Sequence, residues 1–238
     1  MKAVITGASS GIGKALCIEV CSRFSSPKVL GIARREEPLK DLSNMFGERF
    51  DYIVADLSKP ESLNMVFRKA QASLGKVDLL VNNAGFGLYR ELLEHSDEEL
   101  ISMTIVNFIA PINLTKKLLP LLHNNSAVVN VLTTGLHFLM LKLPAYGATK
   151  IALHYATEVL RRELKSKGIR VVSVYPGVID TEFHRRAGSP PPSWVKPIKP
   201  EQVAKAILDA IVKGREKVYV PQYTSLARIF GPFLPMIY

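Results

Sequence analysis

The chain has 238 residues, of which 47% are hydrophobic and 22% are charged, with two cysteines and a formal net charge of +10. The apolar content excludes an intrinsically disordered or collagen-like chain, the cysteine count excludes a disulfide-stapled scaffold, and the length is enough to bury a sizeable core within one α/β domain. The positive charge favours an anionic partner, which could be nucleic acid, an anionic membrane or a phosphorylated cofactor.

Apolar, β-branched runs alternate along the chain with longer segments of helical periodicity, which is typical of βαβ units on a parallel sheet. Strands are predicted at Lys2–Thr6, Lys28–Ala33, Phe50–Ala55, Val77–Asn82, Ala127–Leu132, Ile169–Tyr175 and Lys217–Val220. Helices are predicted at about Gly11–Phe24, Pro38–Phe46, Glu61–Leu74, Asp97–Leu119, Ala145–Lys167 and Pro200–Lys213. We therefore expect one doubly wound α/β domain over residues 1–238, with helices on both faces of a parallel sheet.

Two segments depart from this alternation. Residues 178–199 include a proline-rich stretch and are predicted to form a substrate loop, and residues 221–238 form an apolar tail interrupted by Pro232 and Pro235. No segment has the roughly 18–20 consecutive apolar residues of a membrane span. Met1 leads directly into the first predicted strand, which is unlike a signal peptide, so we expect a cytoplasmic protein.

The first strand ends in the glycine-rich segment Thr6–Gly13, which leads directly into the first helix. Glycine lets the backbone turn tightly and approach a pyrophosphate, whose charge is favoured by the amino end of a helix. The spacing G-x-x-x-G-x-G differs from the general dinucleotide fingerprint, and a simple tight turn is the alternative. Its position favours nucleotide binding, with contacts expected from Gly7, Ser9, Ser10, Gly11, Ile12 and Gly13.

The residues after the second and third strands bear on the choice of dinucleotide. An acidic residue after the second strand would accept hydrogen bonds from the adenosine ribose and repel a 2′-phosphate. This chain instead has Arg34 and Arg35, whose guanidinium groups suit a phosphate dianion, although a solvated basic loop is the alternative. We therefore predict NADP(H) in preference to NAD(H), with Asp56 and Leu57 flanking the adenine.

Tyr146 and Lys150 stand four residues apart at the start of a predicted helix, so both project from one helical face. A tyrosine with its ordinary pKa of about 10 is a poor acid or base at neutral pH, but a neighbouring ammonium group stabilises the phenolate. Taken by itself, this spacing also fits a chance pair on the surface.

In combination, these motifs resemble the short-chain dehydrogenase/reductase family in its common form with a Y-x-x-x-K active site. The resemblance covers nearly the whole chain and rests on Thr6–Gly13, Asn82–Gly85, Asn107, Tyr146 with Lys150, and Pro176-Gly177 with Thr181. It implies a three-layer Rossmann-type fold with seven parallel strands in the order 3-2-1-4-5-6-7 and three helices on each face.

The resemblance also implies roles for individual residues. Tyr146 would donate a proton to a carbonyl or accept one from an alcohol, and Lys150 would lower the pKa of Tyr146 and hydrogen-bond the nicotinamide ribose. Asn107 would hold a water molecule in a proton relay. The cofactor site would be completed by the segments after the fourth and sixth strands, namely Asn83, Ala84, Gly85, Pro176, Gly177, Val178 and Thr181.

One position departs from the family's pattern. The family places a serine thirteen residues before the tyrosine, where this chain has Thr133, followed by Thr134. A threonine hydroxyl can still hydrogen-bond a substrate oxygen, while the added methyl group restricts the side-chain rotamer and narrows the pocket. Thr133 therefore joins Asn107, Tyr146 and Lys150 in the predicted catalytic set. A dinucleotide-binding sensor with little turnover is the alternative.

The segments that line the substrate cleft in this family are apolar here. They contribute Phe86, Leu88, Leu136, Phe138, Leu139, Met140, Leu143, Val178, Phe183 and Trp194. We expect a hydrophobic ketone, aldehyde or alcohol as substrate, although packing in the core would explain some of these side chains equally well. His137 lies in one of these segments and His154 follows Tyr146 by two helical turns, but packing explains both more simply than contact with substrate.

The remaining features concern partners. The basic residues are scattered and no nucleic-acid recognition motif is present, so we expect neither nucleic acid nor a membrane span. Cys17 and Cys21 are predicted to be buried thiols on the first helix, and no metal site is expected. Because helices Asp97–Leu119 and Ala145–Lys167 match the family's usual association surfaces, we expect a homodimer or homotetramer.

Overall fold

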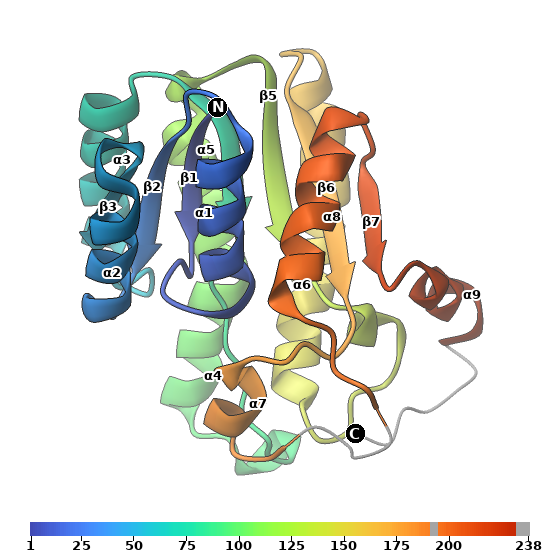
Figure 1. Ribbon diagram of the computed structural model, residues 1–238. Coiled ribbons are helices and arrows are strands. Elements are labelled where there is room, and N and C mark those ends of the chain that lie inside the picture. The colour runs from blue at the N-terminus through green and yellow to red at the C-terminus, as the bar shows by residue number, and fades with distance from the viewer. Residues whose placement is uncertain (191–194, 232–238) are drawn as a thin grey trace.

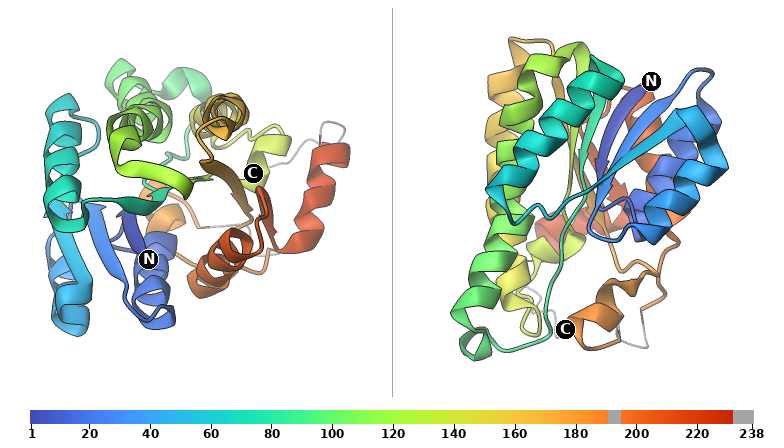
Figure 2. Two further views of the ribbon diagram at one scale, coloured as in Figure 1. Left: turned by 90° about the horizontal axis from the view of Figure 1, so that it is seen from above. Right: turned by 90° about the vertical axis from the view of Figure 1, so that its left-hand side faces the viewer.

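The computed structural model describes residues 1–190 and 195–231, and it shows a parallel sheet between two layers of helices (Figures 1 and 2). The strands are β1 (Lys2–Thr6), β2 (Lys28–Ala33), β3 (Phe50–Val54), β4 (Val77–Asn82), β5 (Leu122–Val131), β6 (Arg170–Pro176) and β7 (Lys217–Val220). They lie in the order β3-β2-β1-β4-β5-β6-β7, which confirms the α/β fold and the strand order that the family resemblance implied.

Three helices pack on each face of the sheet, as the resemblance also implied. One face carries α1 (Gly11–Arg23), α2 (Glu37–Phe46) and α8 (Pro200–Val212). The other face carries α3 (Pro60–Leu74), α5 (Ala110–Leu118) and α6 (Pro144–Lys165). Three further helices are α4 (Asp97–Thr104), α7 (Glu182–Ala187) and α9 (Ala227–Phe230), and Figure 1 shows α4 and α7 beyond the carboxyl ends of the strands.

Most predicted elements lie within two residues of their predicted bounds, and β5 is the main exception among the strands. It begins at Leu122, five residues before the predicted Ala127. The added residues are irregular, because the pairing with β4 shifts register between Val77 and Leu79 and Asn125 has a φ of +74°. The polar segment His123–Asn125 lacks the apolar run of a buried strand, so the periodicity could not indicate this extension.

The predicted helix Asp97–Leu119 is interrupted in the structure. A π turn at Ile105–Ile109 separates α4 from α5, and Asn107 lies within it. Pro111 stands at the start of α5 and has no N–H group to donate to the carbonyl of Asn107 four residues earlier. The helical register therefore shifts at the residue that the sequence motifs single out for the proton relay.

A chain of buried polar side chains crosses the core beside β4 and β5. The Asn82 amide donates to Asn130 Oδ1 at 2.8 Å, and the Asn130 amide donates to Thr157 Oγ1 on α6 at 2.9 Å. Asn130 and Thr157 are fully buried, so each bond is made without competition from water. Elsewhere in the core, Cys17 and Cys21 are buried free thiols, as predicted.

We expect Asn130→Leu to lower the free energy of unfolding by about 1–3 kcal/mol, because the buried Asn82 amide and the buried Thr157 hydroxyl each lose one of their hydrogen-bond partners. Urea unfolding followed by circular dichroism measures this change. Asn64→Leu, on the exposed face of α3, is the matched control and should change stability by less than about 0.5 kcal/mol. Equal stability of the two variants would contradict a stabilising role for the polar chain.

Candidate active site

A cleft with a volume of about 990 Å³ opens at the carboxyl ends of the strands, next to the point where the strand order reverses beside β1. Ligands of open parallel sheets bind at such a point. Of the predicted site residues, nineteen line this cleft: Gly7, Ser9, Ser10, Gly11, Ile12, Arg34, Arg35, Asp56, Leu57, Asn83, Ala84, Gly85, Thr133, Tyr146, Lys150, Pro176, Gly177, Val178 and Thr181. Gly13 and Asn107 are not among the lining residues.

The connection between β1 and α1 has no room for a side chain at its glycine positions. Gly7 has a φ of +68°, which favours glycine, and a Cβ atom on Gly13 would lie 2.2 Å from the Gly7 carbonyl oxygen. A Cβ atom on Gly11 would come within 2.9 Å of Thr181 Cγ2. Ser10 precedes the first turn of α1, whose unpaired N–H groups favour a phosphate. The turn therefore fits a dinucleotide pyrophosphate, with Gly13 allowing α1 to pack against the turn.

Two arginines and a carboxylate border another part of the cleft. Arg35 Nη2 donates to Ser9 Oγ on the glycine turn at 3.3 Å. Asp56 Oδ1 accepts hydrogen bonds from the Ser58 N–H group and hydroxyl at 2.9 and 2.8 Å. Burial opposes ionisation of Asp56, but these bonds and the nearby Arg34 charge outweigh it and lower its pKa. The Asp56 carboxylate therefore faces the cleft ionised, with one oxygen already engaged.

Thr6, at the end of β1, joins the strand ends that border the cleft. Its hydroxyl donates to the Val81 carbonyl at 3.2 Å and accepts from the N–H groups of Asn83 and Ala84, each at 2.9 Å. The Asn83 amide donates to the Thr6 carbonyl at 3.0 Å. These bonds fix the segment after β4 against the glycine turn, and Thr6 is a structural anchor that the motif analysis did not single out.

Asn107 does not line the cleft, but its side chain hydrogen-bonds the backbone of Phe86, which does. Its Oδ1 accepts from the Phe86 N–H group at 3.0 Å, and its Nδ2 donates to the Phe86 carbonyl at 2.8 Å and to Thr149 Oγ1 at 3.1 Å. A Cβ atom on Gly85 would lie 3.0 Å from Asn107 Oδ1, so glycine is needed for this close approach. The side chain of Asn107 therefore positions the backbone of the cleft wall.

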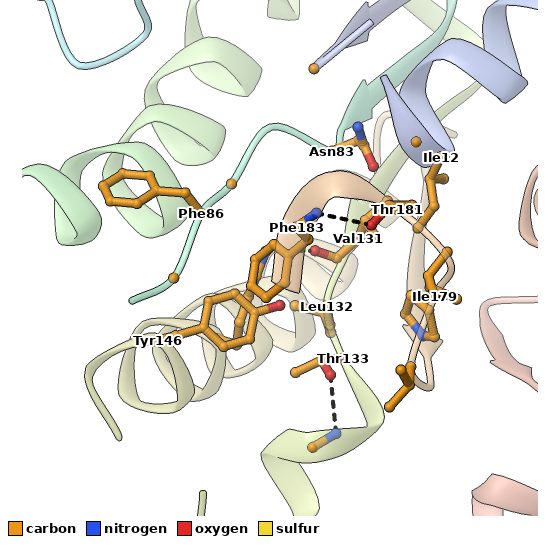
Figure 3. A pocket seen from close by; sticks show the side chains of 18 of the residues that line it. Ile12, Asn83, Phe86, Val131, Leu132, Thr133, Tyr146, Ile179, Thr181 and Phe183 are labelled. Atoms are coloured by element: carbon orange, nitrogen blue, oxygen red, sulfur yellow. Dashed lines mark hydrogen bonds between the residues drawn. The ribbon is translucent and has the colours of Figure 1, made fainter. Parts of the chain in front are cut away.

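Tyr146 and Lys150 lie on the first turns of α6, and Figure 3 shows the Tyr146 hydroxyl pointing into the cleft. Lys150 Nζ donates to the Val131 carbonyl at 2.9 Å and lies 5.7 Å from the centre of the Tyr146 ring. Burial lowers the pKa of Lys150 to about 8 and raises that of Tyr146 above its ordinary value. The expected lowering of the Tyr146 pKa by Lys150 is therefore not found: burial is the largest influence on this pKa and favours the neutral phenol.

The structure also distinguishes the two threonines that follow β5. Thr133 stands near Tyr146, and its hydroxyl acts against the effect of burial on the Tyr146 pKa. The Thr133 hydroxyl also accepts from the Gly135 N–H group at 3.1 Å (Figure 3). The Thr134 hydroxyl instead donates to the Tyr175 carbonyl at 3.1 Å. Thr133 is therefore the residue that occupies the serine position of the family.

The part of the cleft beyond Tyr146 is largely apolar. Phe86, Leu88, Phe138, Met140, Leu143, Val178 and Phe183 line it, as predicted. The Phe183 ring packs against Tyr146 with ring centres 5.2 Å apart. Leu136 and Leu139 were predicted wrongly, because Leu136 packs beside Tyr175 and the side chain of Leu139 is mostly exposed. Trp194 lies outside the described residues.

Several cleft residues could not be found by motif matching. The described part of the tail contributes Tyr223, Thr224, Leu226, Ala227 and Phe230, while residues 232–238 lie outside the described residues. Helix α7, within the predicted substrate loop, adds Glu182, His184 and Arg186 to the predicted Phe183. His137 and His154 instead line a separate cavity of about 330 Å³, where they hydrogen-bond Tyr219 and Tyr175. The packing interpretation of these two histidines is therefore supported.

The family model of the short chain dehydrogenases matches residues 1–191. An uncharacterized oxidoreductase from Staphylococcus aureus is 29% identical over 216 residues, which are 90% of this chain and 91% of that protein. These matches and the site geometry agree: the chain belongs to the short-chain dehydrogenase/reductase family, whose members are NAD(P)(H)-dependent oxidoreductases.

Solved structures of the family share the fold. A short-chain dehydrogenase from Streptomyces avermitilis superposes with a TM-score of 0.84 at 29% identity, covering 96% of this chain and 90% of that one. One from Burkholderia cenocepacia in complex with NADP has a TM-score of 0.81 at 29% identity, covering 99% and 98%. One from Burkholderia phymatum in complex with NAD has a TM-score of 0.84 at 20% identity, covering 100% and 96%.

Neither a membrane-spanning helix nor a metal-binding cluster occurs among the described residues. Within residues 1–190 and 195–231, no helix is both long and apolar enough to cross a membrane. The same residues contain no group of three or more His, Cys, Asp or Glu side chains placed to hold a metal ion.

The buried ammonium group of Lys150 predicts a pH-dependent stability. Its folded-state pKa of about 8 is below that of an unfolded lysine, so between pH 8 and about 10 the unfolded chain binds the additional proton. The contribution of Lys150 to the unfolding free energy therefore rises with pH, by on the order of 2 kcal/mol between about pH 7.5 and 9.5. Lys150→Met should remove this rise in urea unfolding, whereas exposed Lys165→Met should keep it. Parallel pH profiles of the Lys150 variant and the wild type would refute the prediction.

Proposed function

We propose that this chain is an NADP(H)-dependent oxidoreductase that interconverts a carbonyl and an alcohol on a hydrophobic small molecule, with Tyr146 as the proton donor or acceptor. The observation that carries the proposal is that one cleft contains both a basic, glycine-rich part suited to phosphates and an apolar part next to a proton donor. Arg34, Arg35 and the glycine turn border one part, while Tyr146 and Thr133 stand beside an apolar part.

The cofactor is assigned by the fit of the residues present. The glycine turn and the amino end of α1 suit its pyrophosphate, Arg34 and Arg35 suit an adenosine 2′-phosphate, and Asp56 and Leu57 would flank the adenine. The residues proposed to hold its nicotinamide half are Asn83, Ala84, Gly85, Lys150, Pro176, Gly177, Val178 and Thr181. When bound, NADP(H) supplies the hydride chemistry, and the related Burkholderia cenocepacia enzyme in complex with NADP supports this choice.

The protein's own residues manage the proton and the substrate oxygen. The raised pKa keeps Tyr146 neutral, so its hydroxyl can donate both a hydrogen bond and a proton to a carbonyl oxygen. Lys150 carries a proton below about pH 8, and its positive charge near the ring would stabilise the phenolate left behind. Thr133 would hold the substrate oxygen beside Tyr146. Asn107 would fix the cleft wall through Phe86 and hold the water of a proton relay.

The substrate class follows from the lining of the cleft beyond Tyr146. Phe86, Leu143 and Phe183 present apolar surface there, and the described part of the tail adds Leu226 and Phe230. A hydrophobic ketone or aldehyde would bury its apolar part against these side chains, with the carbonyl at Tyr146. In this proposal residues 1–238 form one nucleotide-binding domain, with segments 178–199 and 221–238 bordering the substrate.

We also propose that the chain forms a homodimer or homotetramer. Ile151, Tyr155 and Val159 recur every four residues along α6, and each is at least 40% exposed. Ile101 on α4 is also exposed. An apolar stripe of this kind on a helix is typical of an association surface.

Tyr146→Phe tests the proton donor. Removing the hydroxyl should lower kcat by at least about a hundredfold for NADPH-dependent reduction of a panel of apolar ketones and aldehydes. NADPH binding, measured by fluorescence titration, should remain close to that of the wild type. Tyr52→Phe removes a hydroxyl from β3, outside the cleft, and should leave both quantities unchanged. Wild-type turnover by the Tyr146 variant would refute the assignment, and turnover of charged or sugar-like carbonyls alone would refute the substrate class.

Arg34→Asp tests the coenzyme choice. A carboxylate at this position should repel a 2′-phosphate and accept hydrogen bonds from an unmodified ribose, as acidic residues do after the second strand of NAD-binding folds. The ratio of kcat/KM for NADPH to that for NADH should fall by at least about tenfold. Arg68→Asp makes the same charge change on the exposed part of α3 and should leave the ratio unchanged. An unaltered ratio in the Arg34 variant would contradict a phosphate-binding role.

A further inference from the structure

Glu182, the first residue of α7, is surrounded by arginines. Its carboxylate pairs with Arg35 Nη1 at 3.2 Å and Arg185 Nη2 at 3.0 Å, and also with Arg186. Arg35, Glu182 and Arg186 line the large cleft, whereas Arg185 is 78% exposed and does not. The carboxylate that neutralises part of this basic cluster thus lies inside the cleft proposed to bind the coenzyme.

Arg35 joins three parts of the cleft through one guanidinium group. It follows β2, its Nη2 donates to Ser9 Oγ on the glycine turn, and its Nη1 pairs with Glu182 on α7. Both terminal nitrogens are therefore engaged within the protein. These contacts use two of the five N–H groups of Arg35. A phosphate binds arginine best through two parallel N–H groups, so a phosphate that binds the edge with Nη1 must compete with Glu182.

A carboxylate and a phosphate dianion that bind the same edge of one guanidinium group repel each other. We propose that Glu182 sets the strength of coenzyme discrimination by competing with the adenosine 2′-phosphate for Arg35. This inference rests on the proposed NADP(H) specificity and adds a residue that opposes it. A dinucleotide without the 2′-phosphate leaves the Arg35–Glu182 pair in place, so the carboxylate weakens binding of NADP(H) selectively.

The pair is of the kind that can be exchanged. The side chains of Arg35 and Glu182 are 38% and 37% exposed, so the interaction is screened by solvent and each partner can be resolvated. Glu182 also keeps Arg185 and Arg186 as partners when Arg35 moves to a phosphate. The Glu182 carboxylate therefore keeps two counter-charges, both on α7 itself, when the contact with Arg35 is lost.

Isothermal titration of the full chain with 2′,5′-ADP and with 5′-AMP tests the proposal, since the two nucleotides differ in the 2′-phosphate alone. Glu182→Gln should tighten binding of 2′,5′-ADP by about fivefold, equivalent to about 1 kcal/mol, because it removes the competing charge while keeping the shape. Binding of 5′-AMP should not change. Unchanged or weaker binding of 2′,5′-ADP, or equal tightening for both nucleotides, would overturn the proposal.

Matched variants separate this effect from others. Glu163→Gln removes the same charge from the exposed part of α6 and should not alter the ratio of the two dissociation constants. Glu182→Ala should reproduce the gain of Glu182→Gln, and a gain confined to glutamine would indicate a new hydrogen bond and overturn the proposal. If the wild type does not prefer 2′,5′-ADP, the coenzyme assignment itself fails. If the wild type has that preference and the Glu182 variants do not strengthen it, the role of Glu182 alone fails.

Discussion

The architecture of the site depends on one buried hydroxyl at the point where the strand order of the sheet reverses. Thr6 is almost completely buried at the end of β1, and its Oγ1 bonds the Val81 carbonyl and two N–H groups after β4. β1 pairs with β2 on one side and β4 on the other, so the connections that leave these strands diverge and open a cleft. Without the bonds of Thr6, nothing else among the described contacts would tie the segment at Asn83 to the glycine turn so directly. The cleft wall at Gly85 follows this junction directly, and Asn107 hydrogen-bonds the next residue of that wall, Phe86.

The parts of the molecule that could be predicted from the sequence are those encoded locally. Buried parallel strands have continuous apolar runs, and their helices have a 3.6-residue period, so seven strands and six helices are placed within a few residues. The glycine turn and the Tyr146–Lys150 spacing are local too, because a backbone approach and a helical face are set by neighbouring residues. The irregular start of β5 and the short helices α7 and α9 carry no such periodicity, and their positions follow from tertiary contacts.

What could not be predicted involves residues distant in sequence. The bonds from Asn107 to Phe86 span 21 residues, and the Arg35–Glu182 pair joins a strand end to a helix far along the chain. The Tyr146 pKa was predicted wrongly for a related reason. The ammonium group four residues away is visible in the sequence, whereas the burial of Tyr146 is imposed by the whole fold. Burial acts on both members of the pair and drives both toward their neutral forms. The neutral state of the Tyr146 phenol and the lowered pKa of Lys150 therefore both result from the packing around α6.

The charges of the cleft also have a kinetic consequence. Five cationic side chains line it, Arg34, Arg35, Lys150, Arg186 and Lys196, against the two carboxylates Asp56 and Glu182. A concave, partly apolar site with an excess of one charge concentrates the electric field at its mouth and speeds the diffusional encounter with an oppositely charged ligand. The bimolecular association rate of an anionic dinucleotide should thus fall as ionic strength rises, with less effect on the rate at which it leaves. In the proposed coenzyme site, part of the chain's net positive charge would therefore speed capture of the ligand: it would act before any contact is made, at distances where the individual hydrogen bonds of the cleft have no influence.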